Sequence, residues 1–130
     1  MKNDIPIKKV EGVGLAIVPA ADGFWDVYLL NLKDEPIKQL IVSARGYGRL
    51  KEKEVETANI RYYFEEVPAG AVQKIEPLYQ DLVQMANEYW ISFLWNDYMY
   101  DRKYVFVAGS IQAAYFTHIP ILNELGILIK

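Results

Sequence analysis

The most constraining feature of this sequence is a succession of short apolar segments, rich in β-branched and aromatic residues, that turn-forming residues interrupt at short intervals. Such segments are typical of β-strands, because these side chains pack well on a pleated surface. Val13–Val18 ends at Pro19, and Trp25–Leu32 ends at Asp34-Glu35-Pro36. The pattern predicts an all-β domain, mainly β with one or two short helical turns, folded as an antiparallel β-sandwich or a small barrel.

Further strands are expected along the rest of the chain. Leu40–Arg45 is expected to close at Gly46-Tyr47-Gly48, and Lys51–Glu54 to form a solvated loop or the start of a strand. The other expected strands are Val55–Phe64, Val72–Ile75, Tyr89–Trp95, Tyr98–Val107 and Leu125–Ile129. The apolar spacing over Leu78–Met85 fits a short helix or a packed loop, and Ser110–Phe116 is expected to contain a helical turn.

Length and composition limit the function. The 130 residues indicate one domain, 1–130, and a 52% share of hydrophobic residues is too high for a disordered tail. The chain has no cysteine, so disulfides and thiolate metal sites are excluded. The net charge of −3 makes nucleic acid an unlikely partner. No apolar stretch approaches the length that spans a bilayer, and no secretory signal is recognised, so we expect a cytoplasmic protein with no membrane partner.

An aromatic hairpin is the clearest local prediction. Only Asn96 and Asp97 separate Tyr89–Trp95 from Tyr98–Val107, and both residue types tolerate positive φ, so we expect a two-residue type I′ turn. The resulting register pairs Trp95 with Tyr98, Phe93 with Tyr100, Ile91 with Arg102, and Tyr89 with Tyr104 on one face. The other face pairs Leu94 with Met99, Ser92 with Asp101, and Trp90 with Lys103.

The rings of this hairpin have two interpretations. The favoured one is that the regular stripe fills the space between two sheets, as aromatic stripes usually do. That stripe consists of Tyr89, Phe93, Trp95, Tyr100 and Tyr104. The alternative is an aromatic platform for a peptide, a sugar or a base, since Tyr and Trp are favoured at contact surfaces. Trp90, or Tyr98 beside the turn, can serve in this way even if the stripe is core.

No catalytic or metal-binding constellation is recognised. His118 is the only histidine, and no G-x-S-x-G elbow exposes Ser110, the serine nearest to it in sequence. One histidine is too few for a zinc site, and Asp97 and Asp101 lack the spacing of a calcium loop. Gly12-Val13-Gly14 lacks the third glycine of a dinucleotide site. We therefore expect no catalytic residue, no metal and no cofactor, and favour a protein that is not an enzyme.

A basic and aromatic run is the one feature that suggests RNA. In Arg45-Gly46-Tyr47-Gly48-Arg49, two arginines flank an aromatic residue on an expected loop, a combination that can stack on bases and neutralise phosphates. A tight turn with charged flanks is the favoured interpretation, because the chain as a whole is acidic.

Three parts of the sequence carry a resemblance to known proteins. They are Val27–Pro36, Phe64-Glu65-Glu66 with Lys74–Pro77, and Asn87–Phe93 with Tyr104–Val107. Together they resemble a group of short bacterial all-β proteins, some of which are catalogued as phenylalanyl-tRNA synthetase subunits. The resemblance implies an all-β fold, but Arg61-Tyr62-Tyr63-Phe64-Glu65 does not have the Phe-Arg-x-Glu order of a class II synthetase. It therefore implies at most an accessory role. The order of strands around Val27–Asn31 and Ile75–Phe93 is also similar to that of the all-β module preceding Smr nuclease domains, which looks like an interaction domain.

Three functional hypotheses follow. The leading one is a non-enzymatic binding or protein-interaction module that self-associates as a homo-oligomer, motivated by the aromatic content and the apolar end Leu125–Ile129. The second is a small-ligand-binding protein or enzyme with a cleft beside Tyr98–Arg102, lined by Tyr100 or Tyr104 with Arg102. The third is an accessory factor for tRNA or phenylalanyl-tRNA synthetase function that contacts RNA through Arg45, Tyr47 and Arg49.

Overall fold

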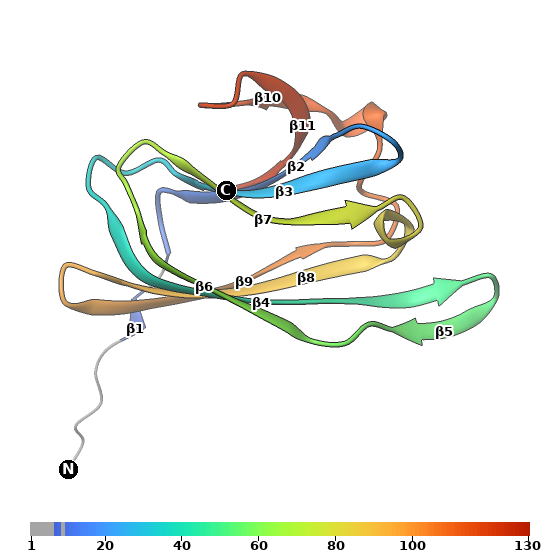
Figure 1. Cartoon of the computed structure of the whole chain (residues 1–130), viewed down its shortest axis with the longest axis horizontal. Helices are drawn as coiled ribbons and strands as arrows, with labels where there is room; N and C mark the ends of the chain where they lie inside the picture. Colours follow the sequence, from blue (N-terminus) through green and yellow to red (C-terminus); the bar gives the residue numbers. More distant parts are fainter. Residues whose placement is uncertain (1–6, 9) are drawn as a thin grey trace, which may run out of the picture.

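Two β-sheets pack face to face in the computed structural model, which describes residues 7, 8 and 10–130 of the chain (Figure 1). Helix is limited, in the described part, to two 3-10 turns, η1 (Leu82–Gln84) and η2 (Ala113–Tyr115). The predicted all-β sandwich with one or two helical turns is confirmed. No helix among these residues is long and apolar enough to span a bilayer.

The first sheet has six strands among the described residues, in the order β1-β9-β8-β4-β5, with β6 also paired to β4. Its strands are β1 (Ile7–Lys8), β4 (Ile37–Leu50), β5 (Lys53–Glu56), β6 (Ile60–Val67), β8 (Ala86–Trp95) and β9 (Tyr98–Phe106). All of these pairs are antiparallel except β1 with β9. Strands β5 and β6 follow one another along the same edge of β4.

The second sheet has five strands in the described part, in the order β10-β11-β2-β3-β7. Its strands are β2 (Val13–Pro19), β3 (Phe24–Asn31), β7 (Val72–Tyr79), β10 (Thr117–Ile119) and β11 (Glu124–Ile129). Every pair in this sheet is antiparallel. The predicted C-terminal strand Leu125–Ile129 therefore lies inside the sheet, between β10 and β2.

The main core lies between the sheets, where alternate side chains of each strand point inward. Leu15, Ile17 and Leu29 of the second sheet and Val42 and Ile91 of the first are fully buried there. A second apolar cluster covers the outer face of the second sheet, because β10 and β11 curl over it (Figure 1). Its fully or almost fully buried members are Ala16, Val18, Leu30 and Ile119.

The predicted aromatic hairpin forms with the predicted register. Trp95 lies opposite Tyr98, and Asn96 and Asp97 have φ of 54° and 65°, as a type I′ turn requires. The stripe is core, since Tyr89, Phe93, Tyr100 and Tyr104 are buried and Trp95 packs against the same cluster. The favoured interpretation of these rings is confirmed.

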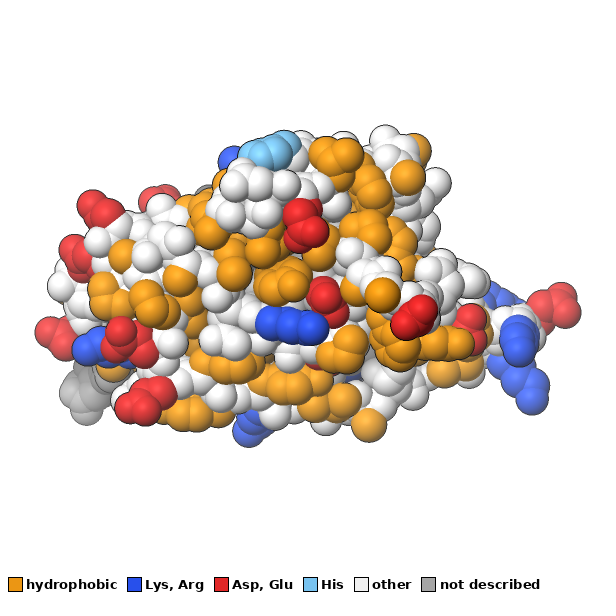
Figure 2. Space-filling model, turned by 45° about the horizontal axis from the view of Figure 1, so that its top comes forward, with side chains coloured by type: hydrophobic (Ala, Val, Ile, Leu, Met, Phe, Trp, Pro, Cys, Tyr) orange, Lys and Arg blue, Asp and Glu red, His pale blue; other side chains and the backbone are white. Residues whose placement is uncertain are grey.

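The prediction that the third strand closes at Gly46-Tyr47-Gly48 is wrong. Strand β4 continues to Leu50 because residues 47–50 pair with β5, and the two strands form a hairpin that projects at the right of Figure 1. The turn lies at Lys51 and Glu52, whose φ angles are 54° and 65°. Basic and acidic side chains lie together at the end of this hairpin (Figure 2).

Two further strand boundaries differ from the prediction. The expected strand Val55–Phe64 is two strands, because the chain breaks at residues 57–59, where Thr57 holds Gly46 by hydrogen bonds through its backbone and hydroxyl. Strand β7 runs past Ile75 to Tyr79, so the expected helical segment is reduced to η1. Pro77 is tolerated in β7 because this strand lies at the sheet edge.

Candidate functional site

The outer face of the first sheet carries a cluster of exposed apolar side chains. Ile41 lies directly opposite Tyr63 on β6, and Ser43 lies opposite Trp90 on β8. Tyr63 and Trp90 are 59% and 46% exposed, whereas the inward-facing neighbours of Trp90 on β8 are buried and those of Tyr63 on β6 are partly buried. Ser43 lies opposite Trp90 on one side, and on the other side Lys103 Nζ lies over its ring, 5.7 Å from the ring centroid. Trp90, a predicted binding residue, therefore lies on a surface of the kind that interaction hot spots use.

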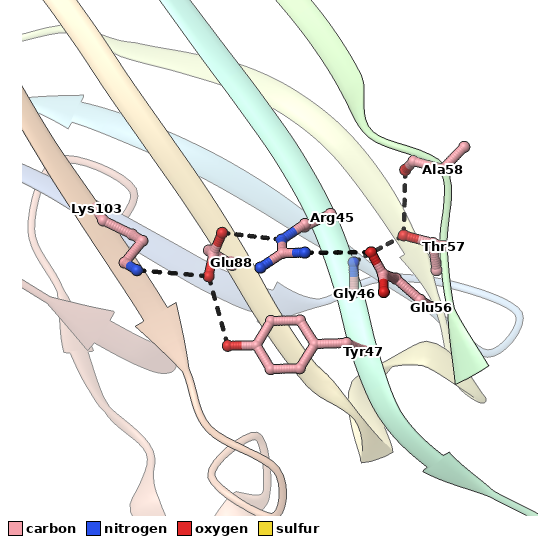
Figure 3. A network of polar contacts seen from close by, with 8 residues as sticks. All are labelled: Arg45, Gly46, Tyr47, Glu56, Thr57, Ala58, Glu88 and Lys103. Carbon is pink, nitrogen blue, oxygen red and sulfur yellow. Dashed lines mark hydrogen bonds and ion pairs between the residues drawn. The ribbon is translucent and has the colours of Figure 1, made fainter. Parts of the chain in front are cut away.

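A polar network borders this surface along β4, β8 and β9 (Figure 3). Arg45 Nε donates a hydrogen bond of 3.0 Å to Glu88 Oε2, and Arg45 Nη1 lies 3.2 Å from Glu56 Oε1. The Tyr47 hydroxyl donates to Glu88 Oε1, which also lies 3.9 Å from Lys103 Nζ. The hydrogen bond to Glu88 raises the pKa of Arg45. Two cations and two carboxylates thus balance one another here.

The structure places Arg45, Tyr47 and Arg49 on strand β4 rather than on a flexible loop. Arg49 Nη1 lies 3.3 Å from Glu54 Oε1, and its Nη2 donates to the carbonyl of Glu52. Both arginines are therefore paired within the chain. A phosphate would have to compete with these carboxylates.

The residues of the expected cleft beside Tyr98–Arg102 are not brought together around a cavity. Tyr100 is buried and stacks on Phe93 with ring centroids 5.3 Å apart, so its ring face is not accessible. Arg102 lies over the ring of buried Tyr104 and donates to the carbonyl of Lys130. Tyr98 is exposed at the start of β9. A cavity of about 340 Å³ lies near the turn, but its lining includes neither Tyr100 nor Arg102.

A carboxylate between the sheets is a site that the sequence prediction missed. Glu76 of β7 faces two tyrosines of the first sheet: Tyr62 donates to Oε1 at 2.6 Å, and Tyr89 donates to Oε2 at 2.7 Å. Burial, together with the hydrogen bond to Glu76, raises the pKa of both tyrosines. The local sequence, Gln73-Lys74-Ile75-Glu76 before Pro77, gives no sign that this glutamate has tyrosine partners in the other sheet.

A cavity of about 250 Å³ opens beside this carboxylate, between the two sheets. We call it the Glu76 crevice, and its walls come from β4, β6, β7, η1 and the break between β5 and β6. More than half of the lining residues are apolar, and the polar ones are Arg45, Thr57, Tyr62, Glu76 and Asn87 of β8. A cavity with apolar walls and a few converging polar groups is the usual form of a small-ligand site.

The lone histidine does not assemble a catalytic site. His118 is exposed, and its Nε2 lies 3.2 Å from Asn123 Oδ1. In Figure 2 its pale blue ring lies open at the top of the molecule. Within residues 7, 8 and 10–130, no three His, Asp or Glu side chains are grouped so that they could hold a metal ion.

Comparison of the chain with protein-family models and with curated proteins finds no match. The resemblance to short bacterial all-β proteins therefore stays a prediction. Three features of the structure bear on function: the edge of the first sheet at β6, the outer face of that sheet and the Glu76 crevice.

Proposed function

We propose that this protein is a non-enzymatic interaction module that pairs with a second copy of itself through the edge strand β6. Among the described residues, β6 pairs with β4 on one side and has no strand on the other. Its backbone donors and acceptors on the free side are a template for another strand. Addition of a strand to such an edge is a common mode of protein recognition.

The side chains of β6 are complementary to a second copy of the same strand. On its outer face, Arg61, Tyr63 and Glu65 follow one another at alternate positions, so the face reads positive, aromatic, negative. In an antiparallel pair centred on Tyr63, Arg61 of each copy lies opposite Glu65 of the other. A parallel pair in register would instead set like charges against each other, so the charges select the antiparallel arrangement.

These charges are available for a partner. Neither Arg61 nor Glu65 forms an ion pair with another described residue, in contrast to Arg45 and Arg49. Tyr63 is 59% exposed, and on the inner face of the same pair Tyr62 would meet Phe64 of the second copy. Aromatic and opposite-charge pairs across strands each stabilise a sheet by roughly 0.2–1 kcal/mol. The two-fold arrangement uses each pair twice.

We propose β6 as the interface in place of the apolar segment Leu125–Ile129 that the sequence suggested. Residues 124–126 of β11 pair with β10 and residues 127–129 pair with β2, and Leu125 is the one β11 residue among the exposed large hydrophobic side chains. Joining two β6 strands would produce one continuous sheet whose outer face carries Trp90 and Ile41 of both copies. The carboxylates that face Arg45 and Arg49 do not support the alternative of an accessory factor bound to RNA.

Charge reversal at β6 tests this proposal. We expect wild-type protein to show a concentration-dependent monomer–dimer equilibrium in sedimentation velocity. Arg61→Glu sets acidic side chains against each other twice and should weaken dimerisation by about tenfold or more, which corresponds to about 1.4 kcal/mol. The double variant Arg61→Glu/Glu65→Arg restores opposite charges in the antiparallel register and should recover the wild-type affinity.

Lys51→Glu is the matched control, because it makes the same change in net charge at the tip of the β4–β5 hairpin. It should leave the dimer affinity unchanged. A wild-type protein that stays monomeric at all concentrations would refute the proposal. So would an Arg61→Glu dimer of unchanged affinity, or a double variant that fails to regain it.

A further inference from the structure

We infer that the Glu76 crevice binds the ammonium group of an organic cation that carries a small apolar body. This site adjoins the edge of β6 that the proposed function uses, because Ile60 and Tyr62 of that strand line the crevice. It lies between the sheets, where β7 of one sheet and β6 of the other come close at their edges. The charge of Glu76, the hydrogen-bonding groups of the lining and its apolar walls each support the inference.

The carboxylate of Glu76 has no cationic partner among the described residues. Each of its oxygens accepts one tyrosine hydroxyl, from Tyr62 or Tyr89. The cations closest to it in sequence or in the lining are engaged elsewhere, since Lys74 pairs with Asp26 and Arg45 pairs with Glu88 and Glu56. The carboxylate is therefore held by neutral hydroxyl donors alone, and an ammonium group would supply the cationic partner that it lacks.

Apart from Arg45, whose guanidinium is paired with Glu88 and Glu56, the polar side chains of the crevice have mainly acceptor capacity left. Asn87 donates from Nδ2 to the carbonyls of Leu82 and Met85, so its Oδ1 is the group left over. The Tyr62 hydroxyl already donates to Glu76, and the Thr57 hydroxyl donates to Ala58. An ammonium group has three donors and no acceptor, so its chemistry matches this lining. A carboxylate or phosphate would find acceptors facing its own oxygens.

The walls of the crevice limit the size and polarity of the group attached to the ammonium. Ile60, Leu78 and Leu82 contribute apolar side chains, and the small residues Ala44 and Gly46 leave the space open. The volume of about 250 Å³ is below the range of about 300–1,000 Å³ that drug-sized ligands occupy. A single ring or a short alkyl chain next to the ammonium therefore fits. Such a group belongs either to a free primary amine or to a lysine side chain of a peptide.

Titration with three probes of similar shape tests the inference. Phenethylamine, 2-phenylethanol and 3-phenylpropionate share an aromatic body but differ in charge, and amide chemical shifts in ¹⁵N-labelled protein report where each binds. We expect saturable shifts around Glu76 and Asn87 with the amine, and binding at least about tenfold weaker with the alcohol and the acid. Nα-acetyl-lysine amide, titrated in parallel, distinguishes a peptide side chain from a free amine by which probe saturates at lower concentration.

Two variants provide the controls. Glu76→Gln should weaken amine binding by about tenfold, whereas Glu52→Gln, the same change at an exposed position in the turn of the β4–β5 hairpin, should leave it unchanged. If Glu76→Gln fails to fold, Ala58→Leu retains the carboxylate and fills part of the crevice, and should also weaken binding. Equal binding of amine and alcohol, unchanged binding in both variants, or shifts confined to other surfaces would overturn the inference. The dimer equilibrium is read separately by sedimentation, so each idea can fail alone.

Discussion

At the scale of single residues, tyrosine hydroxyls tie the two sheets together. Tyr62 and Tyr89 reach from the first sheet to Glu76 of the second, and the Tyr104 hydroxyl donates to the carbonyl of Val13 at 2.9 Å. The other contacts between the sheets of a sandwich are mainly apolar, and apolar contacts impose no defined direction. These hydrogen bonds therefore fix how one sheet is placed on the other, because each needs its partner at a defined distance.

Removal of one of these hydroxyls should weaken the fold measurably. Tyr89→Phe removes the hydrogen bond that the hydroxyl of buried Tyr89 donates to half-buried Glu76, which costs about 1–3 kcal/mol. Tyr63→Phe removes an exposed hydroxyl and should change the free energy of unfolding by less than about 0.5 kcal/mol. Urea denaturation at pH 7 measures both. Equal effects of the two variants would show that the buried hydroxyl has no special role.

Tyr89→Phe should also reduce the loss of folding stability at alkaline pH. Burial raises the pKa of Tyr89 in the folded protein, while the unfolded chain has the ordinary tyrosine pKa of about 10. Above about pH 10 the unfolded state loses this proton first, so the stability that is complete below that pH declines as pH rises further. Tyr89→Phe removes this contribution. A decline as steep as that of the wild type would contradict the assignment.

At the scale of elements, the β8–β9 hairpin shows how far local chemistry can specify structure. The two residues between its strands permit one tight turn, and that turn sets the whole register. Strand β4 is the opposite case. Gly46 and Gly48 suggest that the strand ends there, but it continues to Leu50 because residues 47–50 pair with β5. Local signals therefore predict a hairpin better than they predict where a strand stops.

The second turn residue offers a direct test at this scale. Asp97 has φ of 65°, a conformation in which glycine has no steric penalty. Asp97→Gly should therefore stabilise the protein by about 0.5 kcal/mol, while Asp97→Val should destabilise it by about 1–2 kcal/mol. Thermal unfolding followed by circular dichroism ranks the variants. A valine variant as stable as wild type would mean that the turn is not type I′.

At the scale of the whole molecule, the end of the chain completes the second sheet. Strand β11 pairs with β2 by Ile127 opposite Ile17, although more than a hundred residues separate them in sequence. The strands lie so close that a Cβ at Gly126 would be 2.5 Å from the carbonyl oxygen of Ile17. The outer apolar cluster also depends on this strand, because β10 reaches the sheet only through β11.

Deletion of residues 124–130 should therefore abolish the cooperative fold. The deletion leaves β2 without a partner on one side, and it uncovers apolar side chains on both faces of the second sheet. We expect collapsed amide dispersion in a ¹⁵N–¹H spectrum and no near-ultraviolet circular dichroism. Deletion of Lys130 alone removes no strand residue and should preserve both signals. A dispersed spectrum from the longer deletion would contradict this view.

The β class of this protein, most of its strands and the pairing of Tyr89–Trp95 with Tyr98–Tyr104 follow from the sequence alone. These features depend on side-chain period and turn chemistry, which act over a few neighbouring residues. Trp90 was also foreseen as an outward-facing ring, because its alternation with Tyr89 and Ile91 follows from the same period.

The Glu76 crevice and the free edge of β6 become visible only in the tertiary structure. Glu76, Tyr62 and Tyr89 belong to three strands of two sheets, and their meeting depends on how those sheets stack. The pattern Arg61-Tyr63-Glu65 acquires its significance because β6 lies at an edge, which strand order alone determines. Strand order is set by the total burial of apolar surface across the whole chain. No local segment of the sequence contains that information.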